Sequence, residues 1–297
     1  MFPFQRRPRS TSQAVLSPCQ GGVAALRLEG DPGHPAVAAF ALADSAVLTP
    51  ELLERLAREA GVRNLPLAAL LPAEAYQAVL IEAPNVPADE LPSALRWKMK
   101  DLINFHIDDA VLDHLPVPGR DAQVASLYVV AAQAPAVREL ARPFQQAGLP
   151  LAVIDIRETA QRNLGMRLAP EDYAVALLHF DGEAGLLTFT FGEHLVLSRR
   201  IEGRGSGGDV LFDRVAMEAQ RSVDYFERQF SWLRLAKFYL APMREAPLLA
   251  RKLGEYLPVA AEVLDLHRLF DLSGRLEDER LQNRVFHLLG AALREAA

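Results

Sequence analysis

Apolar and polar residues alternate along the first third of the chain in short runs that turn residues separate. Segment 23–29 alternates, segment 36–43 is apolar, and the turn-rich segment 30–33 lies between them, which predicts two strands joined by a turn. Residues 49–51 (Thr-Pro-Glu) combine an N-cap, a proline at the first helical position and a first-turn acid, as is typical of a helix start. Two more short strands are predicted at 67–71 and 77–82.

The middle of the chain has a helical period followed by two strands. Apolar residues recur every three or four positions over 87–103, which predicts a helix that buries Leu91, Leu95, Met99 and Leu102. After it the pattern predicts strands at 110–117 and 124–132, a helix at about 134–147 and a strand at 151–156. With the strand at 77–82, this order describes a small α+β unit of the kind that is inserted in larger folds.

The second half opens with strands again. Three apolar runs predict a meander, and a long helix follows at 209–230 with one apolar side made of Leu211, Val215, Ala219, Val223 and Phe226. The remaining elements are predicted as a strand at 236–240, a helix at 246–256, a strand at 261–266 and a helix at 278–296. Because both halves begin with consecutive strands and then alternate, the pattern indicates a duplicated α/β fold with a cleft between its halves.

Composition narrows the class of protein. The 297 residues are 50% hydrophobic and 24% charged, as in an ordinary folded protein. A net charge of −6 lacks the basic footprint of a nucleic-acid-binding protein. The single cysteine, Cys19, excludes a disulfide framework and argues against a cysteine-based zinc site. We therefore expect an intracellular protein with no metal centre.

The N-terminal segment 1–14 is basic and carries two phenylalanines. Polar residues follow it where a secretory signal would have its apolar core, and no run of about 18 apolar residues occurs in the chain. We therefore expect a cytoplasmic protein without a transmembrane helix. The tail is interpreted as a frayed basic end, and a weak contact with an anionic membrane surface is the alternative.

Catalytic signatures are scarce. The sequence has no Walker A motif, no His-Glu-x-x-His, no Cys-x-x-Cys and no nucleophile elbow, and its seven histidines lack metal-ligand spacing. Residues 203–208 formally match Gly-x-Gly-x-x-Gly. The strand before them ends a meander, and the acid about twenty residues on, Asp224, lies inside the long helix, so a dinucleotide site is disfavoured. A flexible loop, with phosphate contact as an alternative, fits better.

The most specific stretch is Leu95-Arg96-Trp97-Lys98-Met99-Lys100-Asp101-Leu102-Ile103 together with Asp108-Asp109-Ala110-Val111-Leu112-Asp113. It resembles the PilM family of type IV pilus assembly proteins and, more closely, the MshI relatives of mannose-sensitive haemagglutinin (MSHA) pilus biogenesis. Segments 218–226 and 286–295 resemble the long and the closing helix of that family. The resemblance implies an α/β actin-like ATPase fold. Its two ribonuclease-H-like halves are 15–75 with 151–171, and 172–297, and 76–150 is the inserted α+β subdomain.

The resemblance also implies where a nucleotide would bind. Active members have Asp-x-Gly, small hydroxyl residues and a lysine, whereas this chain has Gln20-Gly21-Gly22-Val23-Ala24-Ala25-Leu26-Arg27. In the second phosphate loop Asp181 is offset, and the adenosine loop carries Pro242 and Arg244 where glycine is expected. A degenerate cleft is therefore expected, with no catalytic residue, no metal and no ATP. The residues left to touch a nucleotide would be Gly21, Gly22, Arg27, Gly205, Gly207 and Gly208.

By resemblance, the function is a cytoplasmic scaffold, peripheral to the inner membrane, that docks a PilN-like (MshJ-like) bitopic protein and other pilus assembly proteins. The partner's cytoplasmic peptide would lie against the inserted subdomain. The candidate contacts are Arg96, Lys98, Lys100, Asp108 and Asp109, and an ordinary solvated helix face is the alternative. Two other functions stay open: an ATPase switch of the same machine, and a GspL-like domain of type II secretion, which the lack of a membrane span disfavours. The oligomeric state is also open, with a homodimer among the alternatives.

Overall fold

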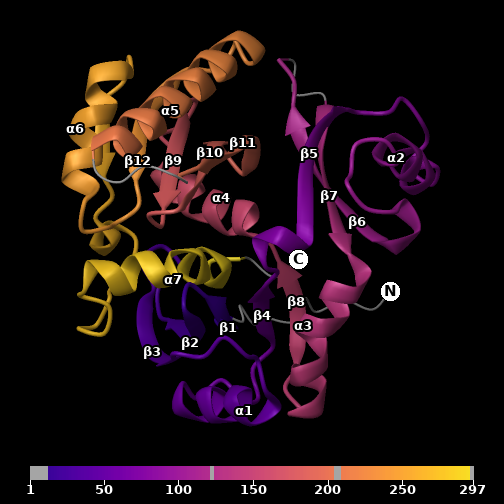
Figure 1. Ribbon diagram of the computed structural model, residues 1–297, viewed down its shortest axis with the longest axis vertical. Helices are drawn as coiled ribbons and strands as arrows, with labels where there is room; N and C mark the ends of the chain where they lie inside the picture. The colour runs from indigo at the N-terminus through magenta and orange to yellow at the C-terminus, as the bar shows by residue number, and fades with distance from the viewer. Residues whose placement is uncertain (1–12, 121–123, 204–208, 295–297) are drawn as a thin grey trace, which may run out of the picture.

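The computed structural model describes residues 13–120, 124–203 and 209–294, which form three β-sheets with helices between and around them (Figure 1). The first sheet has the order β3-β2-β1-β4-β8. Its strands are β1 (Ala14–Cys19), β2 (Gly22–Glu29), β3 (Ala36–Ala43), β4 (Leu67–Leu70) and β8 (Leu151–Asp155). The first three strands form an antiparallel meander, whereas β4 and β8 run parallel to β1.

The second sheet repeats this plan. Its order is β11-β10-β9-β12-β13, formed by β9 (Ala174–Phe180), β10 (Ala184–Phe191), β11 (His194–Glu202), β12 (Leu235–Leu240) and β13 (Ala261–Val263). Again the first three strands form an antiparallel meander and the last two run parallel to its first strand. Two sheets with the same order and strand directions confirm the predicted duplication.

The third sheet lies between β4 and β8 in the sequence. It is antiparallel in the order β5-β7-β6, from β5 (Tyr76–Glu82), β6 (Ala110–Pro118) and β7 (Val124–Gln133). Helix α2 (Leu91–Met99) covers one face, where Leu95 and Met99 are buried. This helix is shorter than predicted, and Leu102, which was expected on its buried face, is 48% exposed because the chain leaves the helix after Met99.

Four further helices cover the sheets: α1 (Pro50–Glu59), α3 (Ala134–Gln146), α5 (Asp209–Gln229) and α6 (Ala246–Tyr256). The predicted start of α1 is confirmed, since the Thr49 hydroxyl accepts a hydrogen bond from the Leu52 amide. Helix α3 was expected to belong to the inserted unit, but its Leu140 and Phe144 are buried in the core beneath the first sheet. The residue boundaries predicted for the inserted subdomain and the two halves remain predictions.

Helices α4 (Arg157–Leu168) and α7 (Glu279–Ala292) pack against each other between the two large sheets (Figure 1). Their backbones are so close at Gly290 that a Cβ there would lie 2.1 Å from the Ala160 carbonyl oxygen. The sequence pattern predicted α7 but neither α4 nor β1. Helix α7 also packs against β1, so α4, α7 and β1 together form the centre of the molecule.

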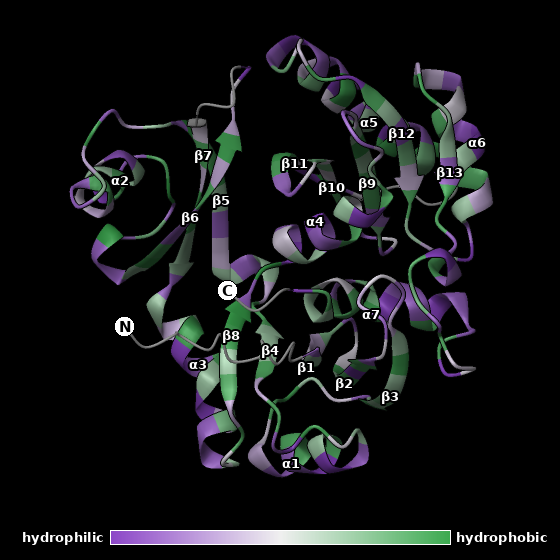
Figure 2. Cartoon of the chain, turned by 180° about the vertical axis from the view of Figure 1, so that it is seen from behind, coloured by the Kyte–Doolittle hydropathy of each residue, from purple (hydrophilic) through white to green (hydrophobic). Residues whose placement is uncertain are grey.

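The apolar residues concentrate between the sheets and their helices. The side of α5 predicted to be apolar is buried in full, and Phe226 stacks on Phe189 of β10. Figure 2 shows hydrophobic and hydrophilic residues alternating along α1 and α3, as expected of helices with one face on a sheet. Within the described residues, no helix is both long and apolar enough to cross a membrane.

Candidate functional site

Three chain turns meet at one edge of the two large sheets. They are the β1–β2 turn, the β9–β10 turn and the segment after β12, which the duplicated topology brings to equivalent positions. Between them lies a cavity of about 170 Å³. It is lined by Gln20, Phe180, Asp181, Gly182, Met243, Arg244, Glu245, Arg280 and Asn283. This cleft holds the glutamine and the offset aspartate that the sequence singled out.

Three polar side chains that line this cleft are bonded to the protein itself. The Gln20 side-chain amide donates to the Asp181 carbonyl at 3.3 Å and so links the two turns. One carboxylate oxygen of Asp181 accepts the amides of Glu183 and Ala184 in its own turn. The Asn283 amide donates to the carbonyls of Phe180 and Pro242. These three side chains therefore tie the turns around the cleft to one another.

Arg284 of α7 clamps the β1–β2 turn. Its guanidinium donates to the Gln20 and Gly21 carbonyls at 2.5 and 2.9 Å, and to the Asp44 carboxylate at 2.5 Å. Gly21 has φ +68°, a conformation that favours glycine. Burial raises the pKa of the Cys19 thiol beside this turn to about 11, so the thiol stays protonated and unreactive at neutral pH.

The structure separates the residues that were predicted to touch a nucleotide. Gly21 and Gly22 form the β1–β2 turn, but Arg27 lies at the other end of β2, pairs with Glu29 at 2.9 Å and does not line the cleft. Gly205, Gly207 and Gly208 lie outside the described residues. Among the residues that the structure describes, no group of three His, Cys, Asp or Glu side chains is placed to hold a metal ion.

A second cavity, of about 210 Å³, lies between the third sheet and the end of β8. We call it the groove. Most of its lining is apolar: Leu71, Val111, Leu115, Val130, Ala132, Val137, Ile154 and Ile156. Val111, on the edge strand β6, is 48% exposed, which is unusual for a valine whose neighbours are apolar. The groove therefore offers accessible apolar surface on the inserted unit and the first half together.

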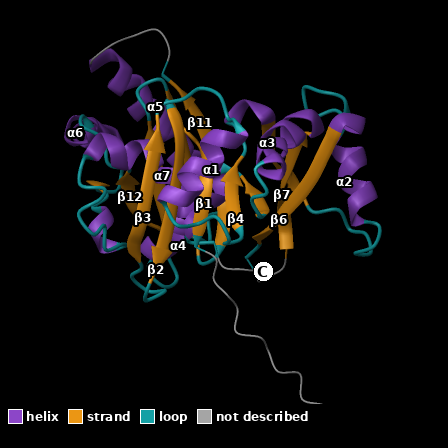
Figure 3. Cartoon of the chain, turned by 90° about the horizontal axis from the view of Figure 1, so that it is seen from below, coloured by secondary structure: helices purple, strands orange, loops and turns teal. Residues whose placement is uncertain are grey.

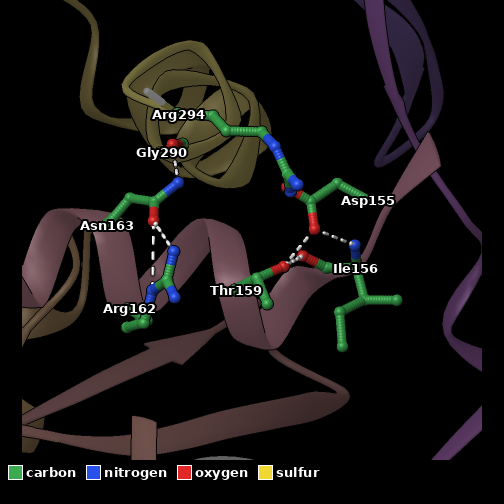
Figure 4. Close-up of polar contacts among 7 residues, drawn as sticks. All are labelled: Asp155, Ile156, Thr159, Arg162, Asn163, Gly290 and Arg294. Carbon is green, nitrogen blue, oxygen red and sulfur yellow. Dashed lines mark hydrogen bonds and ion pairs between the residues drawn. The ribbon is translucent and has the colours of Figure 1, made fainter. Parts of the chain in front are cut away.

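The polar rim of the groove is built around Asp155 (Figure 4). One of its carboxylate oxygens accepts the Ile156 amide at 2.9 Å and the Thr159 hydroxyl, and the other accepts the Arg294 guanidinium at 2.8 Å. Asp155 is 5% exposed, so three donors compensate a buried charge. Because Arg294 follows α7 and Asp155 ends β8, this pair joins the closing helix to the groove.

The five predicted contact residues lie away from the groove. Residues alternate sides along β7, so Val129 and Ala131 face α2 whereas Val130 and Ala132 line the groove. In Figure 3, α2 lies at the outer end of the molecule with β6 and β7 between it and the first sheet. None of Arg96, Lys98, Lys100, Asp108 and Asp109 lines the groove.

Two of the three basic residues among these predicted contacts have structural partners. The Arg96 guanidinium donates to the Ile107 carbonyl at 2.6 Å and to that of Ala110, and Lys98 donates to the Glu82 carbonyl. Arg96 therefore holds the start of β6, which sequence reasoning did not foresee. Trp97, between them, is 78% exposed. Whether this outer face contacts a partner stays a prediction.

Comparisons with known proteins place the fold. No family model matches the sequence, and no curated protein matches it significantly. A chain in the structure of the PilM–PilN type IV pilus biogenesis complex is 24% identical, with a TM-score of 0.74 over 97% of this chain and 99% of that one. A Bacteroides thetaiotaomicron protein described as having the actin-like ATPase fold is 7% identical, with a TM-score of 0.51 over 86% and 94%. The chain has the actin-like ATPase fold.

A third structure extends this comparison. The cytoplasmic domain of EpsL, an inner-membrane component of the type II secretion system of Vibrio cholerae, is 14% identical with a TM-score of 0.53. The match covers 94% of this chain and 93% of that domain. The predicted fold class, with two ribonuclease-H-like halves and an inserted α+β unit, is confirmed.

Proposed function

We propose that this chain is a cytoplasmic scaffold of a type IV pilus assembly complex that docks the cytoplasmic segment of a PilN-like inner-membrane protein. The observation that carries the proposal is the apolar groove between the inserted unit and the first half. The fold likeness to a chain of the PilM–PilN complex supports it, and is greater than the likeness to the EpsL domain. The finer assignment, an MshI-type protein with an MshJ-like partner, rests on the motif at 95–113.

The groove suits an extended peptide. Its walls are aliphatic side chains from β6, β7, α3 and β8, and its rim carries Asp113, Asp155 and Arg294. A buried valine or leucine side chain contributes about 1.5–3 kcal/mol. Two or three such anchors therefore suffice for micromolar affinity after the cost of ordering the peptide. We propose that recruitment through this groove places the chain at the inner membrane.

The proposal includes a cleft that does not use nucleotide. A neutral amide, Gln20, stands where magnesium coordination needs a carboxylate, and Asp181 is engaged in its own turn. The residues present therefore do not fit Mg-ATP. Under this proposal the chain is a pseudo-ATPase in which side-chain hydrogen bonds link the turns around the cleft.

Val111→Glu tests the groove. We expect it to lower affinity for the membrane partner about thirtyfold, because it places an unpaired carboxylate in an apolar cavity beside Asp113. Val263→Glu is a matched control, since Val263 is 39% exposed on the edge strand β13 of the other half. In cells that express the partner, fractionation should find the V111E variant in the soluble fraction and the V263E variant with the membranes.

The same assay distinguishes docking through the groove from two other ways of reaching the membrane. Deletion of residues 1–10 removes the basic tail, and Arg96→Glu with Lys100→Glu reverses the charge of the outer face of α2. The proposal expects the tail deletion to leave the protein on the membrane. Release by the tail deletion, or retention of V111E, would mean that the groove is not the docking site.

A further inference from the structure

A third cavity, of about 410 Å³, adjoins the groove. It shares Leu115, Thr159 and Arg294 with the groove, so the two cavities lie on either side of these side chains. Its other lining residues are Pro116, Arg162, Asn163, Met166, Arg167, Glu193, His194, Leu195 and Leu293. Unlike the apolar groove, this pocket carries three arginines and a histidine against one glutamate.

Arg162 is held in this pocket by a neutral group. Its Nε and Nη2 atoms donate to the Asn163 side-chain oxygen at 3.2 and 2.7 Å, as Figure 4 shows. The Asn163 amide in turn donates to the Gly290 carbonyl at 3.0 Å, and Asn163 is 5% exposed. The guanidinium is thus oriented by a buried amide that α7 fixes in place. A preoriented guanidinium is well suited to bind a planar anion.

The charge of Arg162 is compensated only in part by the protein. Within the described ranges, no carboxylate lies within the 4.0 Å ion-pair distance of its guanidinium. Asp155, the nearest buried acid on the groove side, is already paired with Arg294, and the side chain of Glu193 is 77% exposed. Burial lowers the pKa of Arg162, and the nearby Asp155 carboxylate opposes this effect only in part, because the charge of Arg294 acts in the same direction as burial. An incoming anion would therefore offset an existing electrostatic cost.

We propose that this pocket takes the carboxylate of an aspartate or glutamate of the docked segment, between Arg162 and Arg294. This inference rests on the proposed function and names the chemistry of the partner: apolar anchors for the groove, and an acid at a fixed spacing from them. A charge-assisted bond from a preoriented guanidinium is stronger than a neutral one. Replacing that acid by its amide should weaken binding about tenfold.

The test is selection of random dodecapeptides displayed on phage by the full chain. Wild type should enrich apolar residues together with Asp or Glu at one spacing. The Arg162→Gln variant should enrich the apolar residues without the acid, and Arg162→Lys should retain a weaker acid preference. Arg228→Gln is the control, because Arg228 is exposed in the last turn of α5, outside both cavities, and the wild-type pattern should persist.

A synthetic peptide of the selected sequence and its Glu→Gln or Asp→Asn analogue supply the second measurement. Wild type should bind the acidic form about tenfold more tightly, and R162Q should bind both alike. Enriched peptides without an acid, or an acid preference that survives R162Q, would overturn the inference while leaving the groove intact. The inference would also be overturned if inorganic phosphate displaced the bound peptide while the acidic peptide and its amide analogue bound alike. Failure to enrich any apolar peptide would instead contradict the proposed function.

Discussion

Gly290→Val is expected to destabilise the protein by more than about 3 kcal/mol. A Cβ at this position would lie 2.1 Å from the Ala160 carbonyl oxygen and 2.7 Å from its carbon. Both are backbone atoms of α4, so no side chain can turn aside, and the two central helices must separate. Separation would also break the Asn163 bond to the Gly290 carbonyl. The free energy of unfolding, from urea denaturation followed by circular dichroism, measures the effect.

Gly254→Val is the matched control. Gly254 is also inside a helix, α6, but a Cβ there would meet nothing within 4 Å. Valine has a slightly higher helix propensity than glycine, so this variant should be as stable as wild type or slightly more stable. If the free energy of unfolding of G290V lies within about 1 kcal/mol of the wild-type value, α4 does not pack as closely on α7 as described.

Stability is expected to fall by about 4 kcal/mol between pH 7.5 and pH 5.0 because of two buried histidines. His179 of β9 and His287 of α7 have ring centroids 4.5 Å apart. Each ring donates through Nε2, to the Asn283 carbonyl and to the Gln161 side-chain oxygen respectively. Burial lowers the pKa of His179 to about 4 and lowers that of His287 well below its usual value of 6.5.

The sign follows from the lowered pKa values. Below pH 6.5 the histidines of the unfolded chain bind protons that the folded chain excludes. Their contribution to stability is therefore fully present above this pH and is lost as the pH falls toward 4. Each imidazole contributes about 2 kcal/mol over this range. His179→Gln keeps a donor for the Asn283 carbonyl but cannot titrate, so its loss should be about half that of wild type. Equal unfolding free energies for wild type at the two pH values would contradict the account.

Much of the fold could be predicted because most elements carry a clear apolar period. The second meander, the strands β2 and β3, the long helix α5 and the closing helix α7 were predicted from that period. Helix α4 was missed because its buried face holds Glu158, Thr159, Gln161 and Asn163, which bond to other elements and break the apolar pattern. Hydrophobic periodicity therefore does not detect a buried helix whose core-facing residues are polar.

Strand β1 was missed for a different reason. It is central in the sheet yet contains Pro18, which normally argues against a central strand. Its ladder with β4 covers Ala14 and Val15, and the Ser17 hydroxyl accepts the Leu70 amide beyond them. Proline is tolerated because the neighbouring strand has already left the ladder there. This depends on the lengths of two strands, which the local sequence does not reveal.

The candidate site was predictable in part. The β1–β2 and β9–β10 turns were located from the motif around Gln20 and Asp181, and the structure brings them together. The groove was not located, because its lining residues come from separate elements that are far apart in sequence. The contact residues predicted within the motif at 95–113 lie on the outer face of the inserted unit, opposite the wall that this unit contributes to the groove. A signal for the groove was present in Val111, an exposed apolar residue between the apolar Ala110 and Leu112 on an edge strand.

The central claim is that this chain docks a partner segment and does so without nucleotide. The most direct measurement is calorimetric titration of the full chain with the cytoplasmic N-terminal peptide of its PilN-like membrane protein, without and with about 1 mM Mg-ATP. The account predicts a dissociation constant in the micromolar range that Mg-ATP does not change, and no binding of Mg-ATP alone at low micromolar concentration. Peptide binding that requires Mg-ATP, or no peptide binding under either condition, would contradict it.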